Sequence, residues 1–430
     1  MSLVTLIVIL FVILMFIGVP IGFLLGIVSL GAFFHLQNPL LFMLIPQRMF
    51  AGVDVFVLMC IPFFLFAGEV MNSAKITDRL IDFSNAIVGH FRGGLAHINI
   101  VASIFFAGIT GSAVADTVAL GTVLIPAMEK EGYDLEYSAA VTCCSSNIGP
   151  IIPPSVIMVI YAVIMQVSVA GLFAAGLVPG VLIGISMMLI NGYISKKRGY
   201  PKRVRVTFIQ FIRAFFDATI ALIMPIIILG GILSGIFTPT EAAGIASFYG
   251  LVVGFFFLRT LKIRDIYPLI VNTVSNTAVI FLIIATANIF GWLITSEQMA
   301  NKASHFFMSI SDNPYIILFI INVLLLFAGM ILDTVPAMII LGPLLGATAI
   351  NLGIHPLHFA IVMCTNLTIG LVTPPVGTSL FAICSITGIS LEKVSKASMP
   401  FIIGQIAVLF LITYFPAISM TVPRWLDYVH

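Results

Sequence analysis

Charge is what this sequence has least of. Only 8% of its 430 residues are Asp, Glu, Lys or Arg, whereas 60% are hydrophobic. Soluble globular domains carry about 25% charged residues, so the composition excludes an ordinary soluble protein and indicates an all-α polytopic membrane protein. The formal net charge is +2, with Lys and Arg spread over short loops. We therefore expect no basic face for nucleic acid.

Motifs of catalysis and nucleotide binding are also missing. The sequence has no His-Glu-x-x-His and no Gly-x-Ser-x-Gly, which disfavours an intramembrane hydrolase. It has no Gly-x-x-x-x-Gly-Lys-[Ser/Thr], which disfavours an ATP-driven pump. The five cysteines lie in apolar segments without metal-ligand spacing and are interpreted as small core residues. We expect no enzyme activity, no ATP and no organic cofactor.

Two apolar segments of membrane length are interrupted by the same pattern. Ile148-Gly-Pro-Ile-Ile-Pro-Pro154 and Ile369-Gly-Leu-Val-Thr-Pro-Pro375 share Ile-Gly-x-[Ile/Val]-x-Pro-Pro, 221 residues apart. Proline removes a backbone donor and breaks a helix, and a break within lipid is tolerated where the freed groups face protein, water or an ion. Each break therefore indicates a binding site.

The repetition extends upstream of both breaks. Asp116-Thr117 stands ten residues before Pro126, and Asp333-Thr334 stands ten residues before Pro343. Interrupted hydrophobic segments in corresponding halves of a chain are typical of secondary transporters whose site lies at the repeat interface. We predict a first repeat over residues 1–205 and a second over residues 206–430.

Each repeat is expected to contain five spans, one amphipathic arm and one re-entrant hairpin. The first should hold two helices within 3–36, a span at about 53–71, an arm at 75–92, hairpin 1 at about 95–128, a broken helix at about 135–165 and a span at 168–194. The second should hold spans at about 215–236, 240–258 and 266–294, an arm at 299–310, hairpin 2 at about 315–349, a broken helix at about 355–384 and a last span at 399–420.

Five spans per repeat is an odd number, so the two repeats should be inverted relative to each other. Placing the basic 196–205 loop in the cytoplasm puts 16 of the 19 Lys and Arg residues on that side, and leaves Arg48, Lys302 and Arg424 outside. That asymmetry agrees with the positive-inside rule. Both termini are then expected to face the periplasm.

Oxygen ligands gather at the hairpin tips and the breaks, where we expect about two Na⁺ sites flanking one substrate site. The predicted substrate-binding residues are Thr110, Ser112, Pro150, Asp333, Thr334 and Thr373. The predicted Na⁺ ligands are Ser103, Ser112, Asp116, Ser145, Ser146, Asn147 and Gly149 in the first half, and Gly329, Asp333, Thr334, Thr368, Gly370 and Thr373 in the second.

Several of these residues have a purely structural alternative. Asp116 could cap the N-terminus of a half-helix without touching an ion. Buried Ser and Thr hydroxyls often bond to the carbonyl one turn back. Glu69 and Glu241 are interpreted as interfacial or capping residues. The histidines His97, His355 and His358 are interpreted as loop residues rather than a proton relay.

Neither break and neither predicted hairpin tip contains Lys or Arg. An anionic substrate would then be held by half-helix N-termini and co-bound Na⁺ rather than by an arginine. This makes Na⁺ dependence an expected requirement of transport.

At these residues the chain resembles the large membrane subunit of tripartite ATP-independent periplasmic (TRAP) transporters. The motifs that carry the resemblance are Gly18-Val-Pro-Ile-Gly22, Ile61-Pro-Phe-Phe-Leu-Phe-Ala-Gly68, Thr110-Gly-Ser-Ala-Val-Ala-Asp116, Asn147-Ile-Gly-Pro-Ile-Ile-Pro-Pro-Ser155, Gly235-Ile-Phe-Thr-Pro-Thr-Glu-Ala-Ala243 and Gly370-Leu-Val-Thr-Pro-Pro-Val-Gly377. They are spread over nearly the whole chain.

The resemblance implies an elevator-type, Na⁺-coupled importer of small organic acids, such as C4-dicarboxylates or sialic acid, in the bacterial inner membrane. It implies a small four-helix membrane subunit, expected as a separate chain, and a periplasmic substrate-binding protein. By motif position, Thr110, Ser112 and Asp333 fall where the family binds substrate and Na⁺; Thr110 replaces a Ser that is common there. The alternatives are a stand-alone Na⁺/carboxylate symporter or ion antiporter, and a channel.

Overall fold

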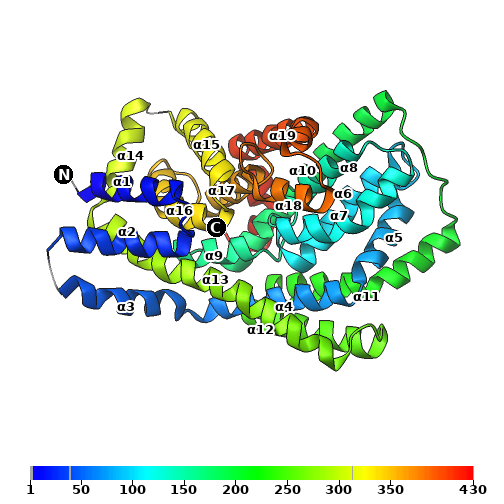
Figure 1. The fold of residues 1–430 in the computed structure, drawn as a ribbon, viewed down its shortest axis with the longest axis horizontal. Coiled ribbons are helices and arrows are strands. Elements are labelled where there is room, and N and C mark those ends of the chain that lie inside the picture. The colour runs from blue at the N-terminus through cyan, green and yellow to red at the C-terminus, as the bar shows by residue number, and fades with distance from the viewer. Residues whose placement is uncertain (1–2, 38–39, 312, 430) are drawn as a thin grey trace.

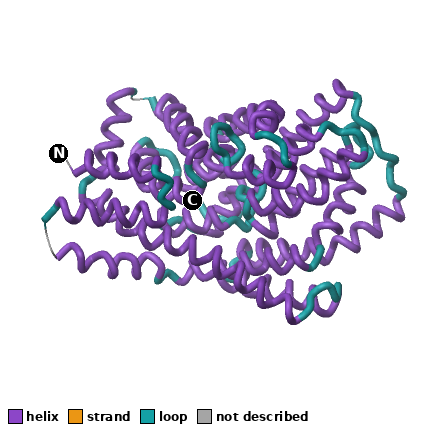
Figure 2. The backbone as a smooth tube through the Cα atoms, viewed as in Figure 1, coloured by secondary structure: helices purple, strands orange, loops and turns teal. Residues whose placement is uncertain are grey.

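The computed structural model describes residues 3–37, 40–311 and 313–429. Every regular element in this part of the chain is a helix, and no strand occurs in it (Figure 2). Eight of the described helices are long and apolar enough to cross a membrane. The predicted all-helical membrane fold is therefore confirmed. The outer ends of the two predicted repeats, residues 1 and 430, lie outside the described residues.

The first half of the chain contains ten α-helices and one short 3₁₀ helix within the described residues. They are α1 (Leu3–Phe16), α2 (Ile21–His35), α3 (Leu40–Val53), η1 (Phe56–Met59), α4 (Cys60–Ser73), α5 (Ile76–Val88), α6 (Gly94–Thr110), α7 (Ala113–Lys130), α8 (Leu135–Ser146), α9 (Val156–Met165) and α10 (Val169–Arg198).

The second half follows the same order, with the arm, the hairpin and the broken helix in sequence. Its helices are α11 (Phe208–Leu233), α12 (Pro239–Val252), η2 (Val253–Phe257), α13 (Ile263–Ser296), α14 (Met299–Ile310), α15 (Pro314–Ile331), α16 (Thr334–Asn351), α17 (Pro356–Gly370), α18 (Thr378–Thr387), α19 (Leu391–Tyr414) and α20 (Ala417–Trp425).

One helix was not expected, and the last expected span ends early. Helix α3 lies where no helix was predicted, because Pro46 and Arg48 interrupt its apolar pattern, although the helix continues through both. The expected last span ends at Tyr414, and Pro416 precedes a separate helix, α20. Proline lacks the N–H that would continue the ladder of α19.

Polar side chains begin many of these helices at the places where the chain turns. The hydroxyl of Thr207 starts α11 and that of Thr238 starts α12, each in a reciprocal capping box with Gln210 and Glu241, respectively. Such caps satisfy backbone N–H groups that have no partner within the helix. Of the two roles expected for Glu241, interfacial or helix-capping, the structure therefore shows the capping role.

The hairpins and broken helices occupy the middle of the molecule, and the remaining helices surround them (Figure 1). Hairpin 1, formed by α6 and α7, lies toward the right of the view together with arm α5. Hairpin 2, formed by α15 and α16, lies toward the left, as does arm α14. Helix α16 packs on α9, and α18 packs on α7, so each hairpin also contacts the broken helix of the other half.

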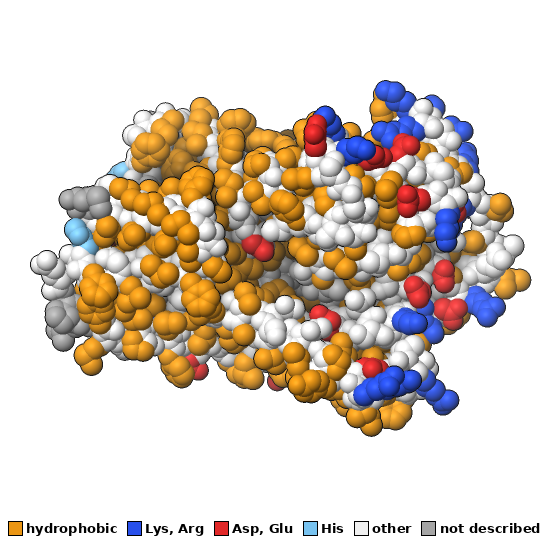
Figure 3. Space-filling view, in the orientation of Figure 1, with side chains coloured by type: hydrophobic (Ala, Val, Ile, Leu, Met, Phe, Trp, Pro, Cys, Tyr) orange, Lys and Arg blue, Asp and Glu red, His pale blue; other side chains and the backbone are white. Residues whose placement is uncertain are grey.

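Basic side chains gather at one end of the molecule. Figure 3 shows Lys and Arg at the right-hand end and hydrophobic side chains over most of the remaining face. This end contains the C-terminal end of α10 and the N-terminal ends of α11 and α13 (Figure 1). Two ion pairs fasten the 199–207 connection there, between Arg198 and Asp134 and between Arg203 and Glu131.

Candidate functional site

The tip of hairpin 1 is a tight turn that packs on the first break. Gly111 has φ +61°, a conformation that side chains disfavour, and a Cβ on it would lie 2.7 Å from the carbonyl oxygen of Pro154. The next residue, Ser112, caps α7 by accepting from the N–H of Ala115. Glycine therefore permits both the turn and the close contact between tip and break.

Asp116 lies in the first turn of α7 and is fully buried. The hydroxyl of Thr110 donates to its Oδ1, while its Oδ2 has no hydrogen-bond partner. A Cβ on Gly149 would lie 2.3 Å from Oδ2, so the carboxylate points at the first break. The capping alternative for Asp116 is wrong, because Ser112 caps α7.

Asn147, at the end of α8, is held by a side chain from the other half of the chain. Its amide donates to Oε1 of Gln405 on α19 at 3.0 Å, and Gln405 donates to the carbonyl oxygen of Cys144 at 2.7 Å. The oxygen Oδ1 of Asn147 is buried without a partner. The carbonyl of Pro150 accepts from the hydroxyl of Ser155, which caps α9.

The second hairpin tip differs from the first in the role of its aspartate. Asp333 is the N-cap of α16, and its Oδ1 accepts from the N–H and the hydroxyl of Thr334. It is exposed rather than buried. Asp116 and Asp333 stand at the same distance before Pro126 and Pro343, but they are not structural counterparts. At the 221-residue spacing of the two breaks, Asp333 aligns with Ser112, and these two residues are the N-caps of α16 and α7.

Hairpin 2 packs on the second break through two glycines. A Cβ on Gly370 would lie 2.4 to 2.7 Å from backbone atoms of Gly329, and the N–H of Gly377 donates to the carbonyl of Met330 at 3.4 Å. The bonds Pro153–Pro154 and Pro374–Pro375 are both cis. The contacts of Gly111 with Pro154 and of Gly329 with Gly370 show that each hairpin tip packs on the break of its own half.

Buried amides link each hairpin to its broken helix at corresponding positions. In the first half, Ser145 donates to Oδ1 of Asn99 at 3.2 Å and accepts from Ser103 at 2.9 Å. In the second half, Asn366 donates to Oδ1 of Asn322 at 2.8 Å. Such bonds between membrane helices contribute about 0.6 kcal/mol on average, so each pair fixes the register of a hairpin more than it adds stability.

A cavity of about 650 Å³ lies where the hairpin tips meet the surrounding helices. Five of the six predicted substrate-binding residues line it: Thr110, Ser112, Pro150, Asp333 and Thr334. Thr373 is not among the described lining residues; it is buried, and its hydroxyl donates to the carbonyl of Ile369. The structure therefore brings both tips and the first break to one cavity, and Thr373 is not part of its described lining.

Three polar residues on the opposite wall were not predicted. Glu69 and Asn72 project from α4, and Asn276 projects from α13. Glu69 was interpreted as an interfacial or capping residue, but it lies inside α4 and faces the cavity. The one sign in the sequence is that Glu69 is a carboxylate within an apolar span. The sequence does not show which segments it meets, because the cavity forms by packing between distant parts of the chain.

Among the residues described along the cavity wall, none is Lys, Arg or His. Buried oxygens without a partner lie near both breaks: Asp116 Oδ2 and Asn147 Oδ1 at the first, and Thr365 Oγ1, Asn366 Oδ1, Thr378 Oγ1 and Ser379 Oγ at or near the second. Unsatisfied oxygens are costly in a low-dielectric interior. Carboxylate, amide, hydroxyl and carbonyl oxygens are ligands that hard cations prefer, so these residues fit Na⁺.

Other predicted Na⁺ ligands have a local hydrogen bond. Ser146 donates to the carbonyl of Thr142 at 2.8 Å, and Thr368 donates to that of Cys364 at 2.6 Å. These are the bonds to the carbonyl one turn back that were considered as the structural alternative. Each hydroxyl oxygen still has lone pairs that can bind a cation. Gly149, Gly370 and Gly329 lie at the contacts between tips and breaks, where their small size is needed.

Two of the three histidines that were expected in loops lie buried inside helices. His358 lies inside α17, is buried, and contacts the hydroxyl of Ser419 and the carbonyl of Thr413. His97 is buried near the start of α6, and its Nδ1 has no partner. Only His355 precedes its helix, where it caps α17. The loop interpretation is therefore wrong for His97 and His358.

Comparison with known proteins gives relatives over nearly the whole chain. Residues 8–418 match the family model described as "Tripartite ATP-independent periplasmic transporter, DctM component". The chain is 38% identical to the sialic acid TRAP transporter large permease protein SiaM of Vibrio cholerae, over 96% of each chain. It is 36% identical to the C4-dicarboxylate TRAP transporter large permease protein DctM of Pseudomonas aeruginosa, over 88% of this chain and 89% of that one.

The fold also matches a solved membrane transporter. The Alcanivorax borkumensis YdaH transporter superimposes with a TM-score of 0.62 at 15% identity, over 90% of this chain and 88% of that one. This likeness concerns the fold alone. The family match and the relatives over nearly the whole chain show that the chain belongs to the DctM component of the tripartite ATP-independent periplasmic transporters, as a multi-pass membrane protein.

Proposed function

We propose that this protein is a Na⁺-coupled secondary importer of small organic acid anions. The observation that carries the proposal is the cavity, in which Thr110, Ser112 and Asp333 meet from two hairpin tips beside unpaired buried oxygens. An anion in a cavity walled by carboxylates and lacking basic side chains needs a compensating cation. Na⁺ bound at the breaks supplies that charge, which couples uptake to the Na⁺ gradient.

The substrate carboxylate is oriented by the hairpin tips. Ser112 and Asp333 begin α7 and α16, so two half-helix N-termini face the cavity, and backbone N–H groups there attract negative charge. The hydroxyls of Thr110 and Thr334 also line the cavity, with their protons donated to Asp116 and Asp333. Asp116, Asn147 and nearby backbone carbonyls would hold one Na⁺ at the first break. Asn366, Thr368 and carbonyls near Gly370 would hold a second.

Transport is proposed to proceed by an elevator movement. The hairpins and broken helices form one body, braced by the Asn99 and Asn322 bonds described above, and α2, α4 and α13 form the facing wall. Gly68 of α4 lies against backbone atoms of Ile109 and Thr110, where a Cβ would be 3.3 Å from the Ile109 carbonyl oxygen. At Gly68 no side chain separates the two bodies, which lets them slide past each other at this contact.

The protein is proposed to act in the bacterial inner membrane with two partners, a separate small membrane subunit and a periplasmic substrate-binding protein. The name of SiaM gives it as a large permease, which supports a small partner subunit. The basic end is placed in the cytoplasm, which leaves both chain ends periplasmic. Sialic acid and C4-dicarboxylates are the substrate classes to test first, since they stand in the names of relatives.

Reconstitution tests this proposal directly. Proteoliposomes containing the permease and its small subunit are supplied with the binding protein and one labelled acid at a time, with Na⁺ or K⁺ outside. We expect uptake of one acid class only with Na⁺ outside and only with the binding protein present. Equal uptake in K⁺ would contradict Na⁺ coupling, and uptake without the binding protein would favour the stand-alone symporter.

A further inference from the structure

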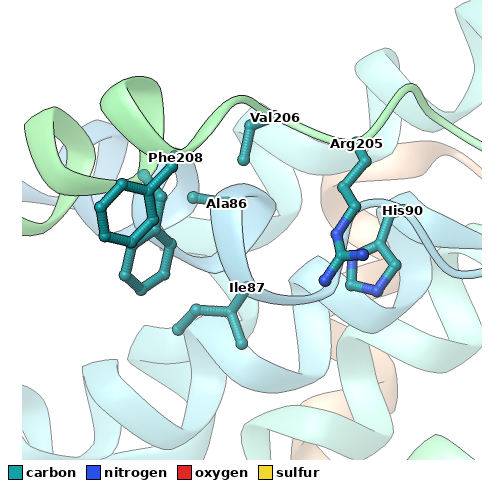
Figure 4. Close-up of a pocket in the computed structure, with 7 residues that line it drawn as sticks. Ala86, Ile87, His90, Arg205, Val206 and Phe208 are labelled. Atoms are coloured by element: carbon teal, nitrogen blue, oxygen red, sulfur yellow. The ribbon is translucent and has the colours of Figure 1, made fainter.

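A second cavity lies at the basic end of the molecule. It has a volume of about 370 Å³ and is formed by the end of arm α5, the 199–207 connection and the start of α11. Its described lining residues are Ala86, Ile87, His90, Arg205, Val206, Phe208 and Phe211 (Figure 4). None of them belongs to the proposed transport site.

One side of this cavity is cationic. Arg205 and His90 lie beside each other in Figure 4, one from the connection and one from the end of the arm. Arg205 forms no ion pair among the described residues, whereas the neighbouring Arg203 is paired with Glu131. The nearest carboxylate on the arm, Asp82, precedes Ala86 by one turn and does not line the cavity. An unpaired guanidinium beside an imidazole N–H is suited to a phosphate group.

The other side of the cavity is apolar and continues onto an exposed apolar surface. Ile87 and Phe211 line it, and Phe208 at its mouth is 75% exposed. Ile209 is 79% exposed and Val204 is 91% exposed. Helix α11, which begins at Phe208, is long and apolar enough to span a membrane. The cavity therefore lies at the boundary between the hydrocarbon region and the aqueous phase, where such side chains contact lipid.

We infer that this cavity binds one anionic phospholipid, with its phosphate on Arg205 and His90 and an acyl chain along Ile87, Phe208 and Phe211. A free phosphate would use only the cationic side and leave the apolar side in water. A zwitterionic lipid would bring a positive headgroup next to a site that already holds two donors and no carboxylate. Basic pockets between helices at the cytoplasmic boundary bind anionic headgroups by this chemistry.

Such a lipid would brace the arm against the second half of the chain. Phe83 of α5 already packs on Phe211 and Phe215 of α11, with ring centroids 6.2 and 5.8 Å apart. The lipid would extend this contact to the end of the arm, at the connection between the two halves.

Native mass spectrometry of the purified permease in detergent tests this inference. Dioleoylphosphatidylglycerol and dioleoylphosphatidylcholine, which share their acyl chains, are titrated separately, and inorganic phosphate is added as a competitor. We expect phosphatidylglycerol to bind more tightly than phosphatidylcholine. We expect Arg205→Gln to weaken phosphatidylglycerol binding about fivefold, since one Lys or Arg near an anionic surface contributes about 1 kcal/mol.

The matched control is Arg213→Gln, which removes one exposed charge from α11 outside the cavity. We expect it to leave the affinity unchanged, and Arg205→Lys to retain most of it. Equal loss in Arg205→Gln and Arg213→Gln, or equal affinity for the two lipids, would overturn the inference. Displacement by millimolar inorganic phosphate would also overturn it, because the apolar contacts would then contribute nothing. Size-exclusion profiles establish that each variant is folded.

Discussion

At the scale of single residues, the roles of the aspartates in the two hairpins differ from those that their sequence context suggested. By motif position Asp333 is expected to bind substrate and Na⁺, whereas Asp116 has a capping alternative. Asp333 is in fact the helix cap, and Asp116 is buried with one free oxygen against the first break. Both still adjoin the proposed site, but a Na⁺ role is now expected to fall first on Asp116.

Asp116→Asn should weaken Na⁺ dependence without preventing folding. The amide keeps the size of the side chain and a bond to Thr110, but it removes the negative charge facing Gly149. We expect the Na⁺ concentration for half-maximal uptake to rise at least tenfold, which corresponds to about 1.4 kcal/mol. The measurement is initial uptake against Na⁺ concentration in proteoliposomes.

The matched control for Asp116→Asn is Glu392→Gln, which removes a carboxylate that is 76% exposed and paired only with Lys396. Its half-saturation should equal that of the wild type. A wild-type Na⁺ response in Asp116→Asn would remove this residue from the ion site.

Gly370→Ala should destabilise the second break. The new methyl group would lie 2.4 to 2.7 Å from backbone atoms of Gly329, which cannot rotate away as a side chain could. We expect a loss of about 1 to 3 kcal/mol, typical of overpacking, seen as a lower melting temperature in detergent. Gly230→Ala is the control, since nothing lies within 4 Å of its Cβ and alanine favours helix. Equal melting temperatures for the two variants would contradict the close contact.

At the scale of elements, the positions of the breaks and hairpins could be anticipated because Gly and Pro act locally. Gly149 and Gly370 lie at breaks, and the tips fall at Gly111 and Leu332, within the ranges expected. Helix α3 was missed because tertiary packing maintains a helix through Pro46 and Arg48. The cavity wall on α4 and α13 was missed because residues 69 and 276 meet only through packing of the whole chain.

The cap of α17 should make stability depend on pH. Burial, and then the charge of Arg424, lower the pKa of His355 below its ordinary value of 6.5. Its neutral Nδ1 accepts from the N–H of Leu357. Because the unfolded chain binds this proton more readily, stability should fall as the pH drops below about 6.5. Melting temperatures at pH 7.5 and pH 5.5 measure the effect.

His355→Asn should reduce this acid sensitivity, since asparagine caps helices well and does not titrate. The same change at exposed His305 on α14 is the control, because it removes an imidazole that caps no helix. An acid-induced shift in His355→Asn as large as in the wild type would show that this cap is not responsible.

At the scale of the whole molecule, the two arms should lie on opposite sides of the membrane. Asp78 on α5 and Lys302 on α14 are both exposed. Four native cysteines are buried and Cys384 is partly buried, so Cys384→Ser provides a low-reactivity background. In right-side-out vesicles, we expect a membrane-impermeant maleimide to label Lys302→Cys at once. Asp78→Cys should react only after permeabilisation. Labelling of both from one side would mean parallel rather than inverted repeats.

The cavity draws its walls from almost the entire polypeptide, with Ile21 at one extreme and Leu371 at the other. Asp116, Thr110 and Gly149, in contrast, all emerge from the ribosome within the first half. During translation the hydrogen-bond partner of this carboxylate and the break that it faces are therefore both made long before the cavity exists. The passage for cargo, however, is completed only near the end of synthesis.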